Sequence, residues 1–140
     1  MKRKVLLDTG PLVALLNHRD RYHGWALDRF AEIEPPLLTC EAVLTEACHL
    51  LRGLPRGERI VLDALQSGAI EVAFALQEEA LAVQEYRTRY ANIPMDLADA
   101  CLVRMTELSP GSPVLTLDSD FRVYRTRDRR VIPLIAPPNV

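Results

Sequence analysis

Residues 5–16 have the sequence VLLDTGPLVALL, and this stretch indicates the class of fold. Residues 5–7 are an apolar run of strand length that ends at Asp8. Pro11 suits the first turn of a helix, so a short helix is predicted over residues 11–16. A buried strand that leads directly into a helix is typical of parallel sheets, because parallel strands need crossover connections. The stretch therefore predicts an α/β fold.

The rest of the chain continues this alternation of strands and helices. Helices are predicted over residues 22–33, 41–51, 55–66, 77–90 and 95–108, and strands over residues 37–39, 69–73, 114–117 and 131–134. Sheets of short apolar parallel strands are covered on both faces. No repeat, linker or low-complexity segment interrupts the order. The sequence predicts one domain over residues 1–140, with three layers: a central parallel sheet flanked by helices.

Length and charge limit the classes of function. A chain of 140 residues can bury one core without the help of metal or disulfide bonds. Its 17 Lys and Arg residues against 19 Asp and Glu residues give a formal net charge of −2. Binding to nucleic acid through bulk positive charge is therefore excluded, because that binding scales with the number of phosphates neutralised. Any contact with nucleic acid is expected to be local.

Two residue types exclude further chemistries. Lysine occurs only at Lys2 and Lys4, which excludes a Walker A loop, a Schiff-base lysine and a phosphate-receiver domain. Cys40, Cys48 and Cys101 form no CxxC pair, and we expect them to be small buried residues in a reducing cytoplasm. The N-terminal apolar run is too short for a signal peptide and no run reaches the length of a membrane span. We expect a cytoplasmic protein with no membrane role.

Two strands are followed directly by a carboxylate. Asp8 follows residues 5–7 and Asp118 follows residues 114–117, so both should project from the carboxyl edge of the sheet, where ligands of open α/β sheets bind. For either residue alone, a helix cap or a turn residue is the more ordinary interpretation. Together the two would repel each other unless a cation lies between them.

Predicted helices carry three further acids of interest. Asp96 has an ordinary structural explanation in the first turn of its helix, near the positive end of the helix dipole. Asp99 is surrounded by apolar neighbours and has no explanation as good. Glu46 lies at the border of the apolar stripe of its helix, where a solvated flanking residue and a functional residue are both possible interpretations.

Asp8, Glu46, Asp99 and Asp118 come from four separate segments and form a constellation. Two carboxylates about 5 Å apart repel by about 3 kcal/mol at an effective dielectric constant of about 20, so a cluster needs a cation or must protonate. Oxygen ligands favour Mg²⁺ or Mn²⁺. The three histidines have no spacing suited to zinc. The sequence therefore predicts a magnesium or manganese site.

Four motifs resemble those of PIN-domain ribonucleases, and most closely the VapC-type toxins of toxin–antitoxin pairs. They are DTGPLVAL at residues 8–15, TE at residues 45–46, DLADA at residues 96–100 and TLDSDF at residues 116–121. Their order and spacing match the family over essentially the whole chain. No motif is specific alone, whereas four in register are strong evidence.

The resemblance implies a role for each acid. Asp8, Glu46, Asp99 and Asp118 correspond to the catalytic acids, and Asp8, Asp99 and Asp118 to metal ligands. Possible additional site residues are Asp96, Asp120, Thr9 and Thr116, the two threonines as hydroxyls that hold the carboxylates. Asp118 and Asp120 compete for one role, and the strand-end position favours Asp118. The implied activity is Mg²⁺- or Mn²⁺-dependent hydrolysis of RNA, by one or two ions.

The resemblance also implies partners: an RNA substrate, a second copy of the chain in a homodimer and a cognate antitoxin protein. A cluster of five arginines is a candidate contact with RNA or an acidic partner: Arg122, Arg125, Arg127, Arg129 and Arg130. The alternative for each is a solvated loop residue. Candidate apolar groups for a partner surface are Tyr22, Trp25, Leu27, Phe30, Leu44, Cys48 and Leu51, with burial as the alternative for most of them.

Two other functions fit part of the pattern. A PIN-like module without catalysis, or with a housekeeping role, could bind RNA or a partner protein, although the intact acidic set counts against it. An aspartyl-phosphate phosphatase with Asp8 as nucleophile would need a lysine in the site, and none exists beyond Lys4.

Overall fold

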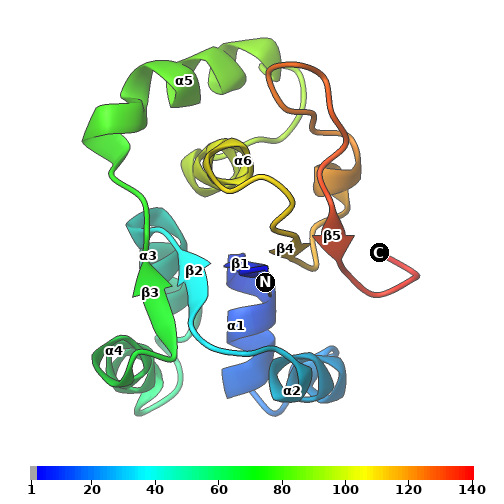
Figure 1. The fold of residues 1–140 in the computed structure, drawn as a ribbon. Coiled ribbons are helices and arrows are strands. Elements are labelled where there is room, and N and C mark those ends of the chain that lie inside the picture. The colour runs from blue at the N-terminus through cyan, green and yellow to red at the C-terminus, as the bar shows by residue number, and fades with distance from the viewer. Residues whose placement is uncertain (1–2) are drawn as a thin grey trace.

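The computed structural model describes residues 3–140 and confirms a three-layer α/β fold (Figure 1). The five strands are β1 (Leu6–Leu7), β2 (Leu37–Thr39), β3 (Ile70–Val72), β4 (Val114–Leu115) and β5 (Leu134–Ile135). The helices are α1 (Thr9–Leu16), α2 (His23–Glu32), α3 (Glu41–Leu50), α4 (Gly57–Ser67), α5 (Leu76–Arg89) and α6 (Leu97–Leu108), with a 3₁₀ helix, η1, over Ser119–Arg122. Met1 and Lys2 lie outside the described residues.

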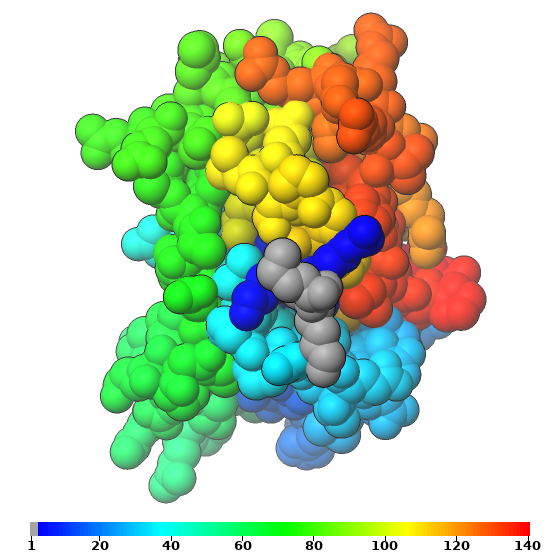
Figure 2. Space-filling view, viewed as in Figure 1, coloured from blue at the N-terminus to red at the C-terminus, as the bar shows by residue number. Residues whose placement is uncertain are grey.

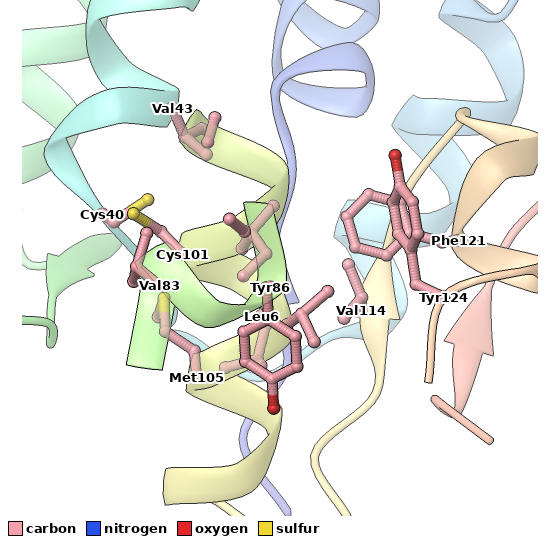
Figure 3. Close-up of a cluster of buried hydrophobic side chains, with 14 of the residues drawn as sticks. Leu6, Cys40, Val43, Val83, Tyr86, Cys101, Met105, Val114, Phe121 and Tyr124 are labelled. Carbon is pink, nitrogen blue, oxygen red and sulfur yellow. The ribbon is translucent and has the colours of Figure 1, made fainter. Parts of the chain in front are cut away.

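All strands are parallel, in the order β3-β2-β1-β4-β5. Side chains alternate between the two faces of a strand. On β1, Leu6 packs in one apolar cluster, with α5 and α6, and Leu7 packs in the other, with α1 and α4. Figure 3 shows Leu6 beside Val114 of β4 in the first cluster. The sheet therefore has a core on each face.

The helix α6 has more buried residues than any other helix within residues 3–140. It has eight buried residues among its 12, which fits a helix that is apolar on most of its surface. In the space-filling view, α6 (yellow) lies between α5 (green) and the C-terminal segment (orange to red) (Figure 2). No helix within residues 3–140 is long and apolar enough to cross a membrane.

The register of the central strands positions the candidate site. Leu6 pairs with Val114, and the backbone N–H of Asp8 donates to the carbonyl of Leu115 at 3.1 Å. The carboxyl ends of β1 and β4 are thereby level with each other. Residues directly after these strands must lie side by side, although more than a hundred positions separate them in the chain.

Some predicted boundaries were wrong. The helix α1 begins at Thr9 and α6 at Leu97, because Asp8 and Asp96 cap them. The strand predicted over residues 131–134 is replaced by an isolated antiparallel bridge at Val131 and by β5, which begins after Pro133. Pro133 has no backbone N–H, so it cannot donate a hydrogen bond to a neighbouring strand.

Part of the proposed partner surface belongs to the core instead. Leu44 and Leu51 are buried, and Trp25 and Phe30 pack against the same apolar cluster. Leu27 remains 48% exposed. Cys40 and Cys101 are buried as expected and lie side by side in Figure 3, whereas Cys48 is only half-buried.

We expect truncation of Leu6 to destabilise the whole sheet. Leu6 has no exposed surface, and Leu6→Ala should lower the free energy of unfolding by about 2–5 kcal/mol because it leaves a cavity beside the central strand. The matched control is Leu81→Ala on α5, where the side chain is 72% exposed, and the change should stay within about 0.5 kcal/mol. Urea unfolding measures both. Equal effects would contradict this assignment of the core.

Candidate active site

Acidic side chains from separate elements meet at the carboxyl edge of the sheet. They line an open pocket of about 270 Å³, which we call the acidic pocket. Its lining residues are Asp8, Thr9, Gly10, Glu46, Leu50, Asp96, Asp99, Leu117 and Asp118. The four acids expected to act together are all among them, and Lys4 is not.

Asp8 is the most constrained of the acids. One of its carboxylate oxygens, Oδ1, accepts from the backbone N–H of Thr9, and the other, Oδ2, accepts from the Thr116 hydroxyl, both at 2.7 Å. Asp8 is also the N-cap of α1, so the ordinary interpretation of this residue is correct as well. Burial raises the pKa of Asp8 to about 6, and the charges of Asp118 and Glu46 act in the same direction.

The Thr116 hydroxyl connects Asp8 to Asp118. While it donates to Asp8, it accepts from the backbone N–H of Asp118 at 2.9 Å. The Asp118 carboxylate then accepts from the N–H of Asp120 at 2.9 Å and caps η1. Burial raises the pKa of Asp118, and the nearby carboxylates of Asp120 and Asp96 raise it further. One hydroxyl thus orients two neighbouring segments that both carry an acid.

Asp96 and Asp99 form a reciprocal capping box at the start of α6. Asp96 Oδ1 accepts from the N–H of Asp99 at 2.8 Å, and Asp99 Oδ2 accepts from the N–H of Asp96 at 3.1 Å. The expectation that Asp99 has no good structural explanation was therefore wrong. The box also aims the Asp99 carboxyl, which is 8% exposed, into the pocket. Burial raises the pKa of Asp99 to about 8, with Asp96 as the largest charge effect.

Sequence reasoning missed Tyr124. Its hydroxyl donates to the carbonyl of Pro94 and lies 3.4 Å from Asp99 Oδ2, so it supports the chain just before α6 and the Asp99 carboxyl together. The Tyr124 ring is fully buried and packs edge-on against Phe121, at 5.2 Å between centroids, and against Tyr90. The only signal in the sequence was the spacing of three residues between the aromatic residues Phe121 and Tyr124.

Two groups in the pocket have no partner among the described residues. The Thr9 hydroxyl is buried without a hydrogen bond, and the half-buried Glu46 carboxylate accepts none. A buried polar atom without a partner is costly, and an ordered water is the ordinary partner of such an atom. The Glu46 carboxylate is available beside the carboxylates of Asp8, Asp99 and Asp118.

The donor set fits a hydrated magnesium ion. Within residues 3–140, no three His, Cys, Asp or Glu side chains already surround a point where a metal ion could bind. Mg²⁺ keeps several of its waters and is commonly held by one or two carboxylates, so it does not need a closed protein cage. An open pocket with oxygen donors only suits such an ion and does not suit zinc.

A second open pocket of about 400 Å³ adjoins the first. It shares Asp96, Asp99 and Asp118 with the acidic pocket and adds Arg87 and Asp120, beside Pro94 and Met95. Asp118 therefore faces both pockets, whereas Asp120 lines only the second. The preference for Asp118, which rests on its position at the end of a strand, stays a prediction.

The arginines proposed to contact RNA make contacts within the chain. Arg122 Nε donates to the carbonyl of Val140 at 2.7 Å. Arg125 Nη1 donates to the carbonyls of residues 122, 123 and 124. Arg127 lies 3.6 Å from the carboxylate of Glu85. None of the three lines the acidic pocket, so their contact with RNA stays a prediction.

Comparison with known proteins gave a family and a structural relative. The model of the PIN domain family matches residues 5–126, which confirms the resemblance inferred from the motifs. The fold is similar to that of VapC20 from Mycobacterium tuberculosis, a toxin that cleaves the sarcin–ricin loop, with a TM-score of 0.73 and 23% sequence identity. The match covers 86% of this chain and 94% of that chain. No curated protein matches the sequence.

We expect the metal-free protein to lose stability as the pH rises. Asp8 and Asp99 have folded-state pKa values of about 6 and about 8, above the ordinary 3.8, so the folded state binds more protons than the unfolded state between these values. Stability should therefore fall from about pH 4 to about pH 8. Asp99→Asn, whose amide cannot ionise, should flatten the upper part of this fall, and urea midpoints in EDTA measure it.

The control variant is Asp63→Asn on the exposed surface of α4, which should keep the pH dependence of the parent. Millimolar Mg²⁺ at pH 8 should restore stability to the parent by binding the folded state, and should not do so for Asp99→Asn. A parent midpoint that changes neither with pH nor with Mg²⁺ would contradict the shared acidic site.

Proposed function

The chain belongs to the PIN domain family, and on this premise we propose that it is a divalent-metal-dependent endoribonuclease, the toxin of a VapBC-type pair. The observation that carries the proposal is the acidic pocket, which five carboxylates from four separate segments line, among them the four expected from the sequence. The similarity to VapC20, itself a toxin that cleaves RNA, supports it. We place its action in the cytoplasm, where three free thiols are stable.

We assign the binding of Mg²⁺ or Mn²⁺ to Asp8, Asp99 and Asp118. When bound, the ion would lower the pKa of a water and offset the charge of the scissile phosphate. Asp8 is fixed for this role by its two hydrogen bonds, and Asp99 by the capping box. Thr116 holds the Asp8 carboxylate and the backbone of Asp118 in place.

Glu46 acts as the general base in this proposal. Its carboxylate comes from α3 and lines the pocket, and it accepts no hydrogen bond from residues 3–140. A carboxylate free of internal donors can orient the attacking water and take its proton. The water oxygen then bonds to phosphorus as the bond to the leaving oxygen breaks. No covalent intermediate with the protein is required.

The alternative is a PIN module that binds RNA or a protein without cleaving RNA. It is less well supported, because the carboxylates of all four expected positions are present and gathered in one pocket. A phosphatase with Asp8 as nucleophile has less support again, because no lysine of residues 3–140 lines the pocket.

We expect the purified protein to cleave RNA only with a divalent ion. Incubation with total bacterial RNA should yield discrete new 5′ ends in Mg²⁺ or Mn²⁺ and none in EDTA. Asp99→Asn and Asp118→Asn should lower the rate by at least about 100-fold because each removes a charge that holds the metal. Asparagine caps a helix as well as aspartate, so these variants should stay folded.

The Asp63→Asn variant serves as the folded control and should cleave as the parent does. Sequencing of the 5′ ends identifies the cut site. RNA that stays intact with parent protein in every divalent ion would reject the nuclease and favour the binding module. Cleavage that survives Asp99→Asn would place the catalytic residues elsewhere.

We assign two apolar surfaces to the proposed protein partners. A pocket of about 310 Å³ between α1, α2 and α4, lined by residues such as Leu16, Phe30 and Ile60, suits an apolar segment of an antitoxin. A groove between α3 and α4 suits the homodimer. The groove combines the apolar Leu62 and Leu65 with Arg52 and Glu58, and charges of both signs allow two identical surfaces to complement each other.

We expect a dimer at tens of micromolar that depends on this groove. Leu62 is 46% exposed on α4, and Leu62→Arg should shift sedimentation toward a monomer because it places a charge in an apolar contact. Leu108→Arg is the matched control, since Leu108 is 49% exposed at the end of α6 and outside the groove. A parent that sediments as a strict monomer would contradict the proposed homodimer.

A further inference from the structure

A nuclease with an acidic pocket must also attract a polyanion, so the cations near the pocket are informative. Most guanidinium groups near the C-terminal segment are engaged: Arg122 and Arg125 donate to backbone carbonyls, and Arg130 pairs with Asp128 at 2.9 Å. Arg104 is held between Glu79 and Glu107. These side chains have little capacity left to bind phosphate.

Arg87 differs from all of them in its position. It lies in the last turns of α5, is exposed, and lines the second pocket together with Asp96, Asp99 and Asp118. Among residues 3–140, it is the only basic residue that lines either of the two adjoining pockets. Its guanidinium makes no hydrogen bond, ion pair or ring contact with any described residue.

The lack of pairing across this pocket is the key observation. Arginine and carboxylates line the same space, yet no N–O distance of 4.0 Å or less joins Arg87 to an acid within residues 3–140. A pocket of about 400 Å³ is therefore lined by a free guanidinium and by Asp99 and Asp118, two of the candidate metal-binding acids, with no ion pair between the guanidinium and these acids. Phosphate oxygens are the ligands that a planar guanidinium binds best, with two parallel hydrogen bonds.

We propose that Arg87 binds an RNA phosphate adjacent to the scissile phosphate and so fixes the path of the strand across the second pocket. This proposal rests on the ribonuclease function proposed above. The scissile phosphate lies over Asp8, Asp99 and Asp118, and the neighbouring phosphate lies against Arg87. Arg87 is a positioning residue: it binds the substrate away from the reacting atoms and takes no part in proton transfer.

A different role for Arg87 would be to offset the repulsion among the carboxylates. This role has less support. Arg87 is exposed and has no ion pair, so water and salt screen its charge, and it stabilises the nearby carboxylates only weakly. The two roles make different predictions. A charge-offsetting residue would change the Mg²⁺ requirement, whereas a phosphate-binding residue changes the affinity for RNA and its dependence on salt.

The first experiment compares Arg87→Gln with Arg59→Gln. Arg59 is an exposed arginine on α4 that lines neither pocket, so the control loses the same charge. On an RNA substrate that carries the cut site, Arg87→Gln should raise KM about tenfold, in the range of a charged hydrogen bond, and change kcat less than about threefold. Arg87→Lys should recover part of the loss, and Arg59→Gln should match the parent.

The second experiment measures binding without cleavage. A fluorescein-labelled 20-nucleotide single-stranded RNA is titrated by anisotropy in Mg²⁺ at several salt concentrations, with each variant in an Asp99→Asn background. Loss of one phosphate contact should reduce the slope of log affinity against log salt by about 0.7. The Arg59→Gln variant in the same background should keep the slope of its parent.

The outcomes separate the two proposals. If the parent cleaves RNA but Arg87→Gln equals Arg59→Gln in both KM and salt slope, the phosphate site is wrong and the nuclease stands. A changed Mg²⁺ requirement with an unchanged slope would also overturn the phosphate site, in favour of charge offset. If the parent neither cleaves nor binds RNA, the proposed function itself fails, and the role of Arg87 fails with it.

Discussion

The hydrogen bonds of a single hydroxyl, that of Thr116, set the geometry on which the acidic pocket depends. Thr116 stands directly after β4, next to the end of β1, and it donates to Asp8 while it accepts from the backbone of Asp118. Both partners are at the edge of a sheet whose register is set by two buried cores. The hydroxyl therefore ties the Asp8 carboxylate to the backbone of Asp118, and the Asp118 carboxylate is held separately by the N–H of Asp120.

Structural roles and proposed functional roles coincide in these acids. Asp8, Asp96 and Asp118 are each the N-cap of a helix, and Asp99 completes the capping box of α6. Capping satisfies backbone N–H groups that would otherwise lack partners, and it fixes the direction of the carboxylate at the same time. The helix starts therefore hold like charges close together, at the cost of raised pKa values for Asp8 and Asp99.

Local patterns in the sequence were sufficient to predict the fold class and to select four of the acids that line the acidic pocket. An apolar run that ends in aspartate is visible without any knowledge of packing, and the rule for parallel sheets places two such ends at one edge. The double role of Asp99 could not be inferred, because the predicted start of α6 was two residues early and put Asp96 inside the helix. Tyr124, the unpartnered Thr9 hydroxyl and the free Arg87 depend on how distant segments pack, which no local pattern encodes.

The long sequence separation between Asp8 and Thr116, 108 positions, has a consequence for the order of synthesis. When a ribosome has made only the first hundred or so residues, Asp8, Glu46 and Asp99 have been incorporated, but β1 still lacks its neighbour β4 and has one unpaired edge. The Asp8 carboxylate has no hydrogen bond from Thr116 until that residue has been made and β4 pairs with β1. The nascent chain therefore cannot assemble the acidic pocket before the segment that carries Thr116 and Asp118 has left the ribosome.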